Sequence, residues 1–310
     1  MITTITLNAS VDKAYHMESP LRNGTVMRVA QCRNSAGGKG LNVARIVRLC
    51  GETVQASGLV GGHNGAYLES MLDADGIPHC FGKVSGETRS CINILDPQFG
   101  STEYLEPGCT VTELEEQYFV QEVFPKVIAD SAIVTLSGSV PQGMSRDIYA
   151  KLIRAAKAQG KQVLLDTSGA LLKDSLCAQP TMIKPNQDEI EALFGIKIEG
   201  MEQVKEYAVK LYEMGIPYVV ISLGGDGAML VCAEGIYQAV PPKVKVVNTV
   251  GCGDSMVGAF AVALARQLPP QEALRYAAAV GTANALSPNT GDFDPELLPV
   301  LLDQTAIRTL

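Results

Sequence analysis

Two glycines and an aspartate stand at the start of an apolar helix in the stretch NTVGCGDSM, residues 248–256. Gly251 and Gly253 carry no side chain where the backbone turns, so successive N–H groups around Cys252 can converge on one point. The following helix adds partial positive charge there through its N-terminus. Its apolar face consists of Val257, Phe260, Ala261, Leu264 and Leu268. The stretch therefore predicts an anion-binding site made of backbone, with Asp254 beside it.

The carboxylate of Asp254 would be repelled by a phosphate bound next to it, so an inward-pointing Asp254 needs a chemical task. The task that fits is to accept the proton of a hydroxyl group that attacks phosphorus. Aspartate is also a favoured N-cap residue, and we expect Asp254 at the N-cap of this helix. The stretch alone leaves two roles open, a general base and a helix cap without further function.

A second glycine-rich stretch, NSAGGKGLNVARIVRLCG at residues 34–51, contains Lys39 and Asn42. Its glycines Gly37, Gly38 and Gly40 precede a helix with an apolar face of Val43, Ile46, Val47 and Cys50. Backbone N–H groups, a helix N-terminus, a lysine and an amide have the chemistry to bind a polyol and a phosphate. Neither the P-loop pattern G-x-x-x-x-G-K-[ST] nor the nicotinamide pattern G-x-G-x-x-G is present. A strand-to-helix turn with a solvated lysine remains the alternative.

Two further stretches end strands with polar residues. In TMIKPNQDEIEALFG, residues 181–195, Lys184 and Asn186 precede a helix whose first turn contains Glu189. Acidic residues in a first turn are ordinary partners of the helix dipole. The functional alternative is a cluster that binds phosphate oxygens and a hydrated Mg²⁺. The stretch VVISLGGDGAML, residues 219–230, predicts strand, glycine-rich turn and strand, and its turn leaves room for a ribose or a base.

Apolar runs and helical segments alternate from about residue 111 onward. The runs are Ala132–Leu136, Gln162–Asp166, Thr181–Lys184 and Tyr218–Leu223, and the helical segments are 145–159, 187–194 and 201–214. Continuous apolar runs are typical of parallel strands that are buried on both faces. The segments end near Gly160, Gly195 and Gly215, as helix C-caps prefer. The pattern predicts a doubly wound α/β core.

Residues 13–34 and 87–108 break this alternation with short strand-like segments. Within the second of them, Thr88–Asp96 and Ser101–Leu105 are expected to form a hairpin. Together the two regions predict a small β-sheet lid over the edge of the core. No long linker or internal repeat divides the chain, which argues against separate domains.

Composition excludes several classes of function. The 310 residues are 46% hydrophobic and 19% charged, with a net charge of −8, which disfavours binding to nucleic acid or to anionic membranes. Eight cysteines without a C-x-x-C pair and three scattered histidines disfavour a zinc site, a redox motif and a Ser-His-Asp mechanism. No signal peptide is evident, and residues 256–268 are too short to span a bilayer, so a cytoplasmic location is expected.

The stretch AGGKGLNVA, followed about two hundred residues later by NTVGCGDSMVGA, resembles the two signatures of the ribokinase-like PfkB carbohydrate kinase family. The stretches TLNASVD, GETRS, SGSVPQG, IKPNQDE and SLGGDGA extend the resemblance over essentially the whole chain. TLNASVD and TRSCINI are most similar to the branch that includes 1-phosphofructokinase and tagatose-6-phosphate kinase. The resemblance implies one kinase domain, 1–310, with a three-layer α/β/α core and a β-lid. The core would comprise 1–12, 35–86 and 109–310, and the lid 13–34 and 87–108.

The resemblance implies a role for each motif residue. Asp254 would be the catalytic base, and the backbone of Gly251, Cys252 and Gly253 the anion hole for the transferred phosphoryl group. Members of the family usually have Ala or Ser where this chain has Cys252. The sugar would be bound by Asp12, Gly38, Lys39 and Asn42, and the phosphate already on the substrate by Arg89 with Arg28, Lys39 and Ser137. Lys184 and Asn186 would bind the nucleotide phosphates, and Glu189 would bind Mg²⁺ through water. Candidates for the nucleoside side are Ser222, Gly224, Gly227, Asn248 and Asn284.

The implied reaction moves the γ-phosphoryl group of ATP, with Mg²⁺, to a ketohexose phosphate. Tagatose 6-phosphate, converted to the 1,6-bisphosphate, is favoured, and fructose 1-phosphate is the alternative. A non-catalytic sugar-phosphate sensor and a nicotinamide oxidoreductase are the alternatives from other classes. The expected partners are these small molecules and a second copy of the chain, joined through the lid, without nucleic acid or membrane.

Overall fold

A ten-stranded sheet and a four-stranded sheet form the framework of the chain, whose residues 1–310 are all described by a computed structural model. The strands are β1 (Ile2–Thr6), β2 (Ser10–His16), β3 (Gln31–Gly37), β4 (Val54–Val60), β5 (His79–Lys83), β6 (Arg89–Asp96), β7 (Gly100–Leu105), β8 (Ile133–Ser137), β9 (Gln162–Asp166), β10 (Met182–Ile183), β11 (Tyr218–Ser222), β12 (Ala228–Cys232), β13 (Gly235–Val240) and β14 (Ala306–Thr309). The α-helices are α1 (Lys39–Leu49), α2 (Gly62–Ala74), α3 (Glu113–Tyr118), α4 (Phe124–Val127), α5 (Ile148–Ala158), α6 (Gly169–Ser175), α7 (Gln187–Phe194), α8 (Met201–Glu213), α9 (Cys252–Ala265), α10 (Pro270–Leu286) and α11 (Leu298–Gln304). No helix combines the length and the hydropathy that crossing a bilayer requires.

The large sheet has the strand order β14-β13-β12-β11-β10-β9-β8-β1-β4-β5. Its strands from β11 to β5 run parallel, as the continuous apolar runs predicted, whereas β12, β13 and β14 add antiparallel pairs at one edge. The chain leaves β1 toward β4 and β5 on one side and later returns to β8 on the other. Parallel sheets bind ligands at the carboxyl ends of the strands near such a reversal. The fold therefore places the site at the ends of β1, β8, β9, β10 and β11.

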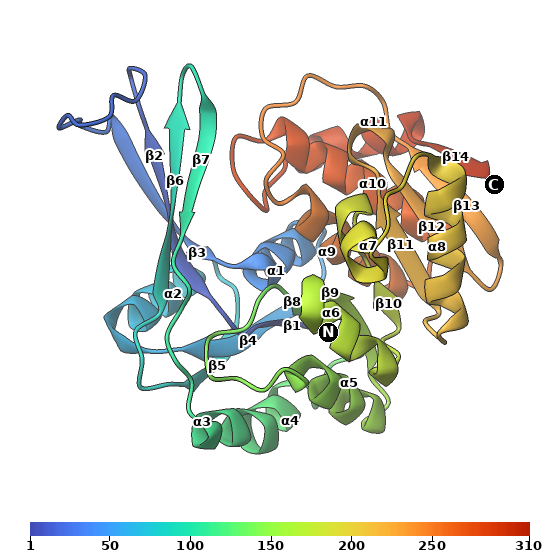
Figure 1. Ribbon diagram of the computed structural model, residues 1–310, viewed down its shortest axis with the longest axis horizontal. Helices are drawn as coiled ribbons and strands as arrows, with labels where there is room; N and C mark the ends of the chain where they lie inside the picture. Colours follow the sequence, from blue (N-terminus) through green and yellow to red (C-terminus); the bar gives the residue numbers. More distant parts are fainter.

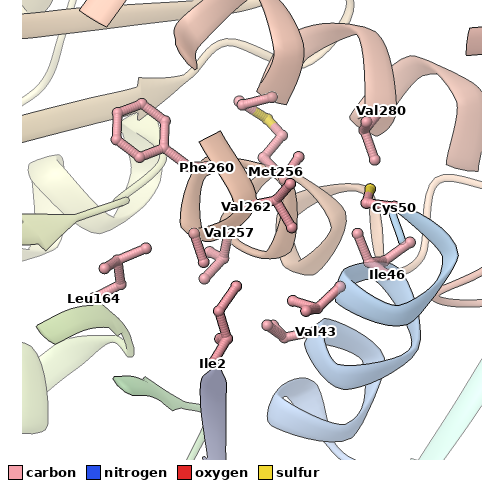
Figure 2. Packing of buried hydrophobic residues seen from close by; sticks show 14 of the residues in the cluster. Ile2, Val43, Ile46, Cys50, Leu164, Met256, Val257, Phe260, Val262 and Val280 are labelled. Atoms are coloured by element: carbon pink, nitrogen blue, oxygen red, sulfur yellow. The ribbon is translucent and has the colours of Figure 1, made fainter. Parts of the chain in front are cut away.

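Helices cover both faces of this sheet, so the core has the expected three-layer α/β/α arrangement. On one face α1, α9 and α10 bury apolar side chains with α2, and on the other face α4, α5, α7 and α8 do so. Helix α9 is apolar nearly all round because it lies between α1, α10 and the sheet. Figure 2 shows Val257 of α9 near Ile2 of β1, with Val43 and Ile46 of α1 beside them. This packing places the N-terminus of α9 next to that of α1.

The small sheet, with strand order β3-β2-β6-β7, projects from the core as a separate layer (Figure 1). Strands β6 and β7 pair antiparallel, which confirms the predicted hairpin. Strands β2 and β3 extend beyond the expected lid limits of 13–34, because they pair without a break from Ser10 with Gly37 to His16 with Gln31. Asp12 therefore lies on the lid sheet and not in the core, which was expected to include residues 1–12.

Candidate active site

A cleft of about 1570 Å³ lies between the lid and the carboxyl ends of the parallel strands. Its wall contains the last residue of four of these strands, Thr6, Ser137, Asp166 and Ser222. The N-terminal residues of α1 and α9 line it as well, so two helix dipoles point toward the same space. Most lining residues are polar. The cleft thus suits a hydrophilic, negatively charged ligand.

The N-terminus of α9 begins at Gly251, which is the N-cap and has a φ of 83°. A Cβ atom at Gly251 would lie 2.7 Å from Cγ2 of Thr290, so both conformation and space require glycine here. The expectation of Asp254 as N-cap is therefore wrong. The left-handed Gly251 starts the helix earlier, and Asp254 occupies the third position of the first turn.

Three backbone N–H groups at this turn donate to no protein acceptor, namely those of Gly251, Gly253 and Asp254. The N–H of Cys252 is already used, since it donates to the carbonyl oxygen of Thr249 over 3.3 Å. The Cys252 thiol does not line the cleft and contacts Asn284 instead. A glycine at position 253 also lets Lys184 approach, because a Cβ atom there would lie 3.1 Å from its Nζ. Free N–H groups and a lysine thus lie close together at the start of α9, and such groups are suited to bind a phosphoryl group.

The carboxyl group of Asp254 is buried beside this point, with 6% of the residue exposed. Nδ2 of Asn42 donates a hydrogen bond of 2.7 Å to its Oδ2 atom. Burial raises the pKa of Asp254 to about 6, against the lowering effect of the positive charge of Lys39. The carboxylate is therefore mostly ionised at neutral pH and has the basicity to accept a proton from a bound hydroxyl group.

Asp166, at the carboxyl end of β9, links two lysines that the sequence analysis assigned to different ligands. Its Oδ2 lies 3.4 Å from Nζ of Lys39, and its Oδ1 lies 3.3 Å from Nζ of Lys184. Burial by itself would raise the pKa of Asp166, but the attraction of Lys184 and Lys39 outweighs it and holds the pKa below the usual range. The charge of Asp166 in turn raises the pKa of Lys39. Lys39 therefore stays protonated, and both lysines line the cleft.

On the lid side of the cleft, the guanidinium of Arg89 is held by the backbone. Nε and Nη2 donate to the carbonyl oxygen of Asn8 over 3.2 and 3.0 Å, and Nη1 donates to that of Glu106 over 2.9 Å. Three of its five N–H groups are thus engaged, which leaves two for a ligand. Asp12 lies nearby, accepts a hydrogen bond of 2.6 Å from Ser10, and has its pKa raised by burial. The pair offers a cation for an anionic group and an acceptor for hydroxyl groups.

On the opposite side, Asn186 and Glu189 form a capping box at the start of α7. Oδ1 of Asn186 accepts from the Glu189 N–H over 2.8 Å, and Oε2 of Glu189 accepts from the Asn186 N–H over 2.9 Å. Both residues line the cleft with Lys184 and Ser222. No three His, Cys, Asp or Glu side chains gather into a cage for a metal ion. A single carboxylate in a cleft that also contains lysines nevertheless fits Mg²⁺, which keeps several waters and takes further ligands from substrate phosphates.

The structure brings most of the predicted site residues together on the wall of this cleft. They are Asp12, Gly38, Lys39, Asn42, Arg89, Ser137, Lys184, Asn186, Glu189, Ser222, Asn248, Gly251, Gly253 and Asp254. Gly224 lines a smaller cavity of about 470 Å³ next to Asn186 and Ser222. The glycine motifs predicted this assembly because they mark the turns at strand and helix ends.

Besides Cys252, three predicted residues lie outside both cavities. Arg28 is exposed on the irregular segment between β2 and β3 and does not line the cleft. Gly227 packs on the carbonyl oxygen of Ala239, where a Cβ atom would lie at 1.9 Å, so it serves the turn between β11 and β12. Asn284 is fully buried, and its amide donates to the carbonyl oxygen of Val250 over 3.0 Å and accepts from the Gly291 N–H over 3.0 Å. It supports the glycine turn and faces no ligand.

Two residues of the site were missed. Asp166 carries a visible signal, since an acid that ends an apolar strand of a parallel sheet points to the ligand edge. Arg45, on α1, lines the cleft and donates to Asn42, but in the sequence it is one of two arginines on an amphipathic helix. Both arginines line the cleft, and only the tertiary structure shows that Arg45 is hydrogen-bonded to Asn42 whereas Arg48 is exposed.

Comparison with known proteins agrees with this geometry. The model of the pfkB family carbohydrate kinases matches residues 3–297. The chain is 37% identical over 310 residues to tagatose-6-phosphate kinase of Staphylococcus epidermidis, covering 99% of each chain. It is 36% identical to 1-phosphofructokinase of Bacillus subtilis, covering 96% of this chain and 98% of the other. The tetrameric inhibited form of phosphofructokinase-2 from Escherichia coli superimposes with a TM-score of 0.89 at 32% identity, covering 97% and 99%. The chain therefore belongs to the PfkB family and is a carbohydrate kinase.

Proposed function

We propose that this kinase transfers the γ-phosphoryl group of ATP to a hydroxyl group of a ketohexose phosphate, and that tagatose 6-phosphate is its preferred acceptor. The product would be the 1,6-bisphosphate. The observation that carries the proposal is that three free N–H groups, two lysines joined by Asp166 and the buried Asp254 line the same cleft. The names of the two curated relatives support a phosphorylated ketohexose as the acceptor. A second candidate acceptor is fructose 1-phosphate, because the two relatives are almost equally similar to this chain.

The geometry supports a direct transfer. The acceptor hydroxyl group lies against Asp254 and gives its proton to the carboxylate as the sugar oxygen forms its bond to the γ-phosphorus. The bond from that phosphorus to the β,γ-bridging oxygen breaks, and ADP leaves with the electron pair. The N–H groups of Gly251 and Gly253 and the ammonium of Lys184 stabilise the charge on the group in transfer. A pure sugar-phosphate sensor would need no such base.

Kinases of this family use ATP, generally with Mg²⁺. We propose that Glu189 holds the ion through water and that Asn186 and Lys184 position the nucleotide phosphates. Bound Mg²⁺ would neutralise charge on the β- and γ-phosphates. Ser222 and Asn248 line the same side of the cleft and are proposed to contact the nucleoside.

The test of this function is ADP release with Mg-ATP against a panel of acceptors. The panel contains tagatose 6-phosphate, fructose 1-phosphate, fructose 6-phosphate, fructose and ribose. We expect the highest kcat/KM with tagatose 6-phosphate. A higher value with fructose 1-phosphate would establish the second candidate. Turnover of free sugars only would contradict a phosphate-binding role for Arg89, and absence of turnover with intact ligand binding would contradict the proposed function.

Replacing Arg89 with methionine is expected to raise KM for the sugar phosphate by about 10- to 100-fold, because one charged hydrogen bond contributes about 1.5–3 kcal/mol. The KM for ATP should not change, since Arg89 lies on the lid side of the cleft. Initial rates at varied sugar phosphate and fixed ATP measure the effect. Arg22→Met, an exposed lid arginine outside the cleft, is the matched control. An equal loss with phosphorylated and free sugar would show that Arg89 serves only the backbone of Asn8 and Glu106.

We also propose that two copies of the chain associate through the lid. Val26, Phe99 and Tyr104 of the lid are 93%, 65% and 59% exposed, and a lid that exposes several large apolar side chains is suited to contact another protein surface. We expect light scattering to give twice the chain mass of 32.9 kDa, and Phe99→Ser with Tyr104→Ser to give the chain mass. Leu114→Ser, at an exposed site on α3, is the control. A wild-type protein of single-chain mass at micromolar concentration would contradict the dimer.

A further inference from the structure

Arg45 connects the end of β3, in the lid sheet, to the carboxyl group of Asp254 through the side-chain amide of Asn42. Its Nη1 donates to the carbonyl oxygen of Ala36 over 2.6 Å, and its Nη2 donates to Oδ1 of Asn42 over 2.5 Å. Nδ2 of Asn42 then donates to Oδ2 of Asp254 over 2.7 Å. The three side chains form a chain of hydrogen bonds that runs in one direction, from cation to amide to carboxylate.

The direction of this chain follows from the chemistry of its first member. A guanidinium has only donors, so the end of the Asn42 amide that faces Arg45 must be the oxygen. The NH₂ end must then face Asp254. Without Arg45, rotation of the amide by half a turn would bring its oxygen against the carboxylate, and the two would repel each other. Asn42 is almost fully buried, with 6% of the residue exposed, so little water is available to form hydrogen bonds with the amide and the carboxylate if the amide is inverted.

We infer that Arg45 is a positioning residue for phosphoryl transfer, which fixes the Asn42 amide so that it donates to Asp254 and holds the carboxylate toward the acceptor hydroxyl group. The inference rests on the proposed role of Asp254 as the base. Arg45 contacts neither the reacting atoms nor the sugar in this scheme. It acts through Asn42, and its loss should therefore change the basicity and the orientation of Asp254.

The charged groups around Arg45 and around Asp254, the two ends of this chain of hydrogen bonds, are consistent with this role. Burial lowers the pKa of Arg45, and the negative charges of Asp12 on β2, Asp75 after α2, Asp254 on α9 and Asp292 after α10 act against this effect. A guanidinium group keeps its proton throughout the working pH range, so Arg45 remains a cation. Lys39, Asp166 and Lys184 face Asp254, and Lys39 and Lys184 favour its ionised form together with the Asn42 hydrogen bond. Loss of that hydrogen bond removes one of the groups that keep Asp254 ionised.

The test is the pH profile of kcat for Arg45→Met at saturating ATP and sugar phosphate. A base must be unprotonated to act, so the wild-type rate should fall as the pH drops through the pKa of Asp254, at about 6. In Arg45→Met the pKa of Asp254 should rise, and the acid limb should move to higher pH by about half to one unit. The KM for ATP should stay constant. An acid limb that does not move would overturn the inference, whereas a wild-type enzyme without turnover would overturn the proposed function instead.

A double-mutant cycle separates positioning from general damage. Asn42→Leu should move the acid limb as Arg45→Met does, and the double variant should show no further shift, because both substitutions remove the same hydrogen bond to Asp254. Arg45→Lys keeps a donor-only cation and should restore most of the wild-type profile, which also keeps the test available if Arg45→Met fails to fold. Arg48 also lines the cleft, one turn further along α1, but it donates to neither Asn42 nor Asp254, so Arg48→Met should leave the limb in place. Additive shifts, or an equal shift in Arg48→Met, would contradict the inference.

Discussion

Replacing Asp254 with asparagine is expected to lower kcat by about two to four orders of magnitude, the contribution of a positioned general base. The amide has nearly the shape of the carboxylate but no basicity, so the acceptor hydroxyl group keeps its proton. The free N–H groups of Gly251 and Gly253 are untouched, and binding of ATP should persist. Release of ADP at saturating substrates measures kcat, and titration calorimetry with an unhydrolysable ATP analogue measures binding.

The matched control for this variant is Asp188→Asn. Asp188 also lies in the first turn of a helix, α7, but it is exposed and does not line the large cleft. Its kcat should equal that of the wild type. A kcat of Asp254→Asn within tenfold of the wild type would contradict the role of base and would leave Asp254 as a support for the start of α9.

Asp166→Asn should have the largest effect on stability, with a loss of about 3–5 kcal/mol in the free energy of unfolding. The carboxylate is buried against Lys184, whose side chain is only 6% exposed, so the substitution leaves a buried ammonium without its counter-charge. The Lys39 side chain is 43% exposed and can turn toward water. The kcat should fall as well, because both lysines lose the group that fixes them.

Urea unfolding at pH 7 measures the stability of this variant. Lys39→Met is the comparison, because it removes the more exposed partner and should cost about 1 kcal/mol or less. If Asp166→Asn and Lys39→Met cost the same, the pairing of Asp166 with Lys184 contributes little to stability. If Asp166→Asn is as stable as the wild type and has a normal kcat, Asp166 has no role in positioning the two lysines of the site.

The sequence predicted the elements that local patterns encode. Continuous apolar runs indicated the parallel strands, and the glycines of NTVGCGDSM indicated where free N–H groups gather. Local patterns do not show which N–H group is already satisfied. The N–H of Cys252 donates to the carbonyl oxygen of Thr249, whereas the N–H of Asp254 is free to bind a ligand. The reason is that Gly251 adopts a left-handed conformation that begins the helix early.

Contacts between distant segments were beyond prediction for the same reason. Asn284 is an amide near the end of a helix in the sequence, and either a ligand or a buried turn could satisfy its four hydrogen-bonding sites. The fold places the turns at Val250 and Gly291 against it, so it binds the backbone. Arg45 likewise gains its significance only when α1 and α9 pack together, since helix periodicity marks it simply as a polar position.

The hydrogen bond between Asn42 and Asp254 joins residues that are 212 positions apart in the chain. Closing a longer loop costs more conformational entropy, and contacts between distant segments slow folding. During synthesis α1 can contact β1 and β4 before α9 has been made, but it has no contact with α9 until that later segment follows. A chain that ends before α9 would have most of the cleft but neither the base nor the anion site. Recovery of enzymatic turnover after denaturation consequently reports the completion of the whole core, because activity cannot return before α1 and α9 are in contact.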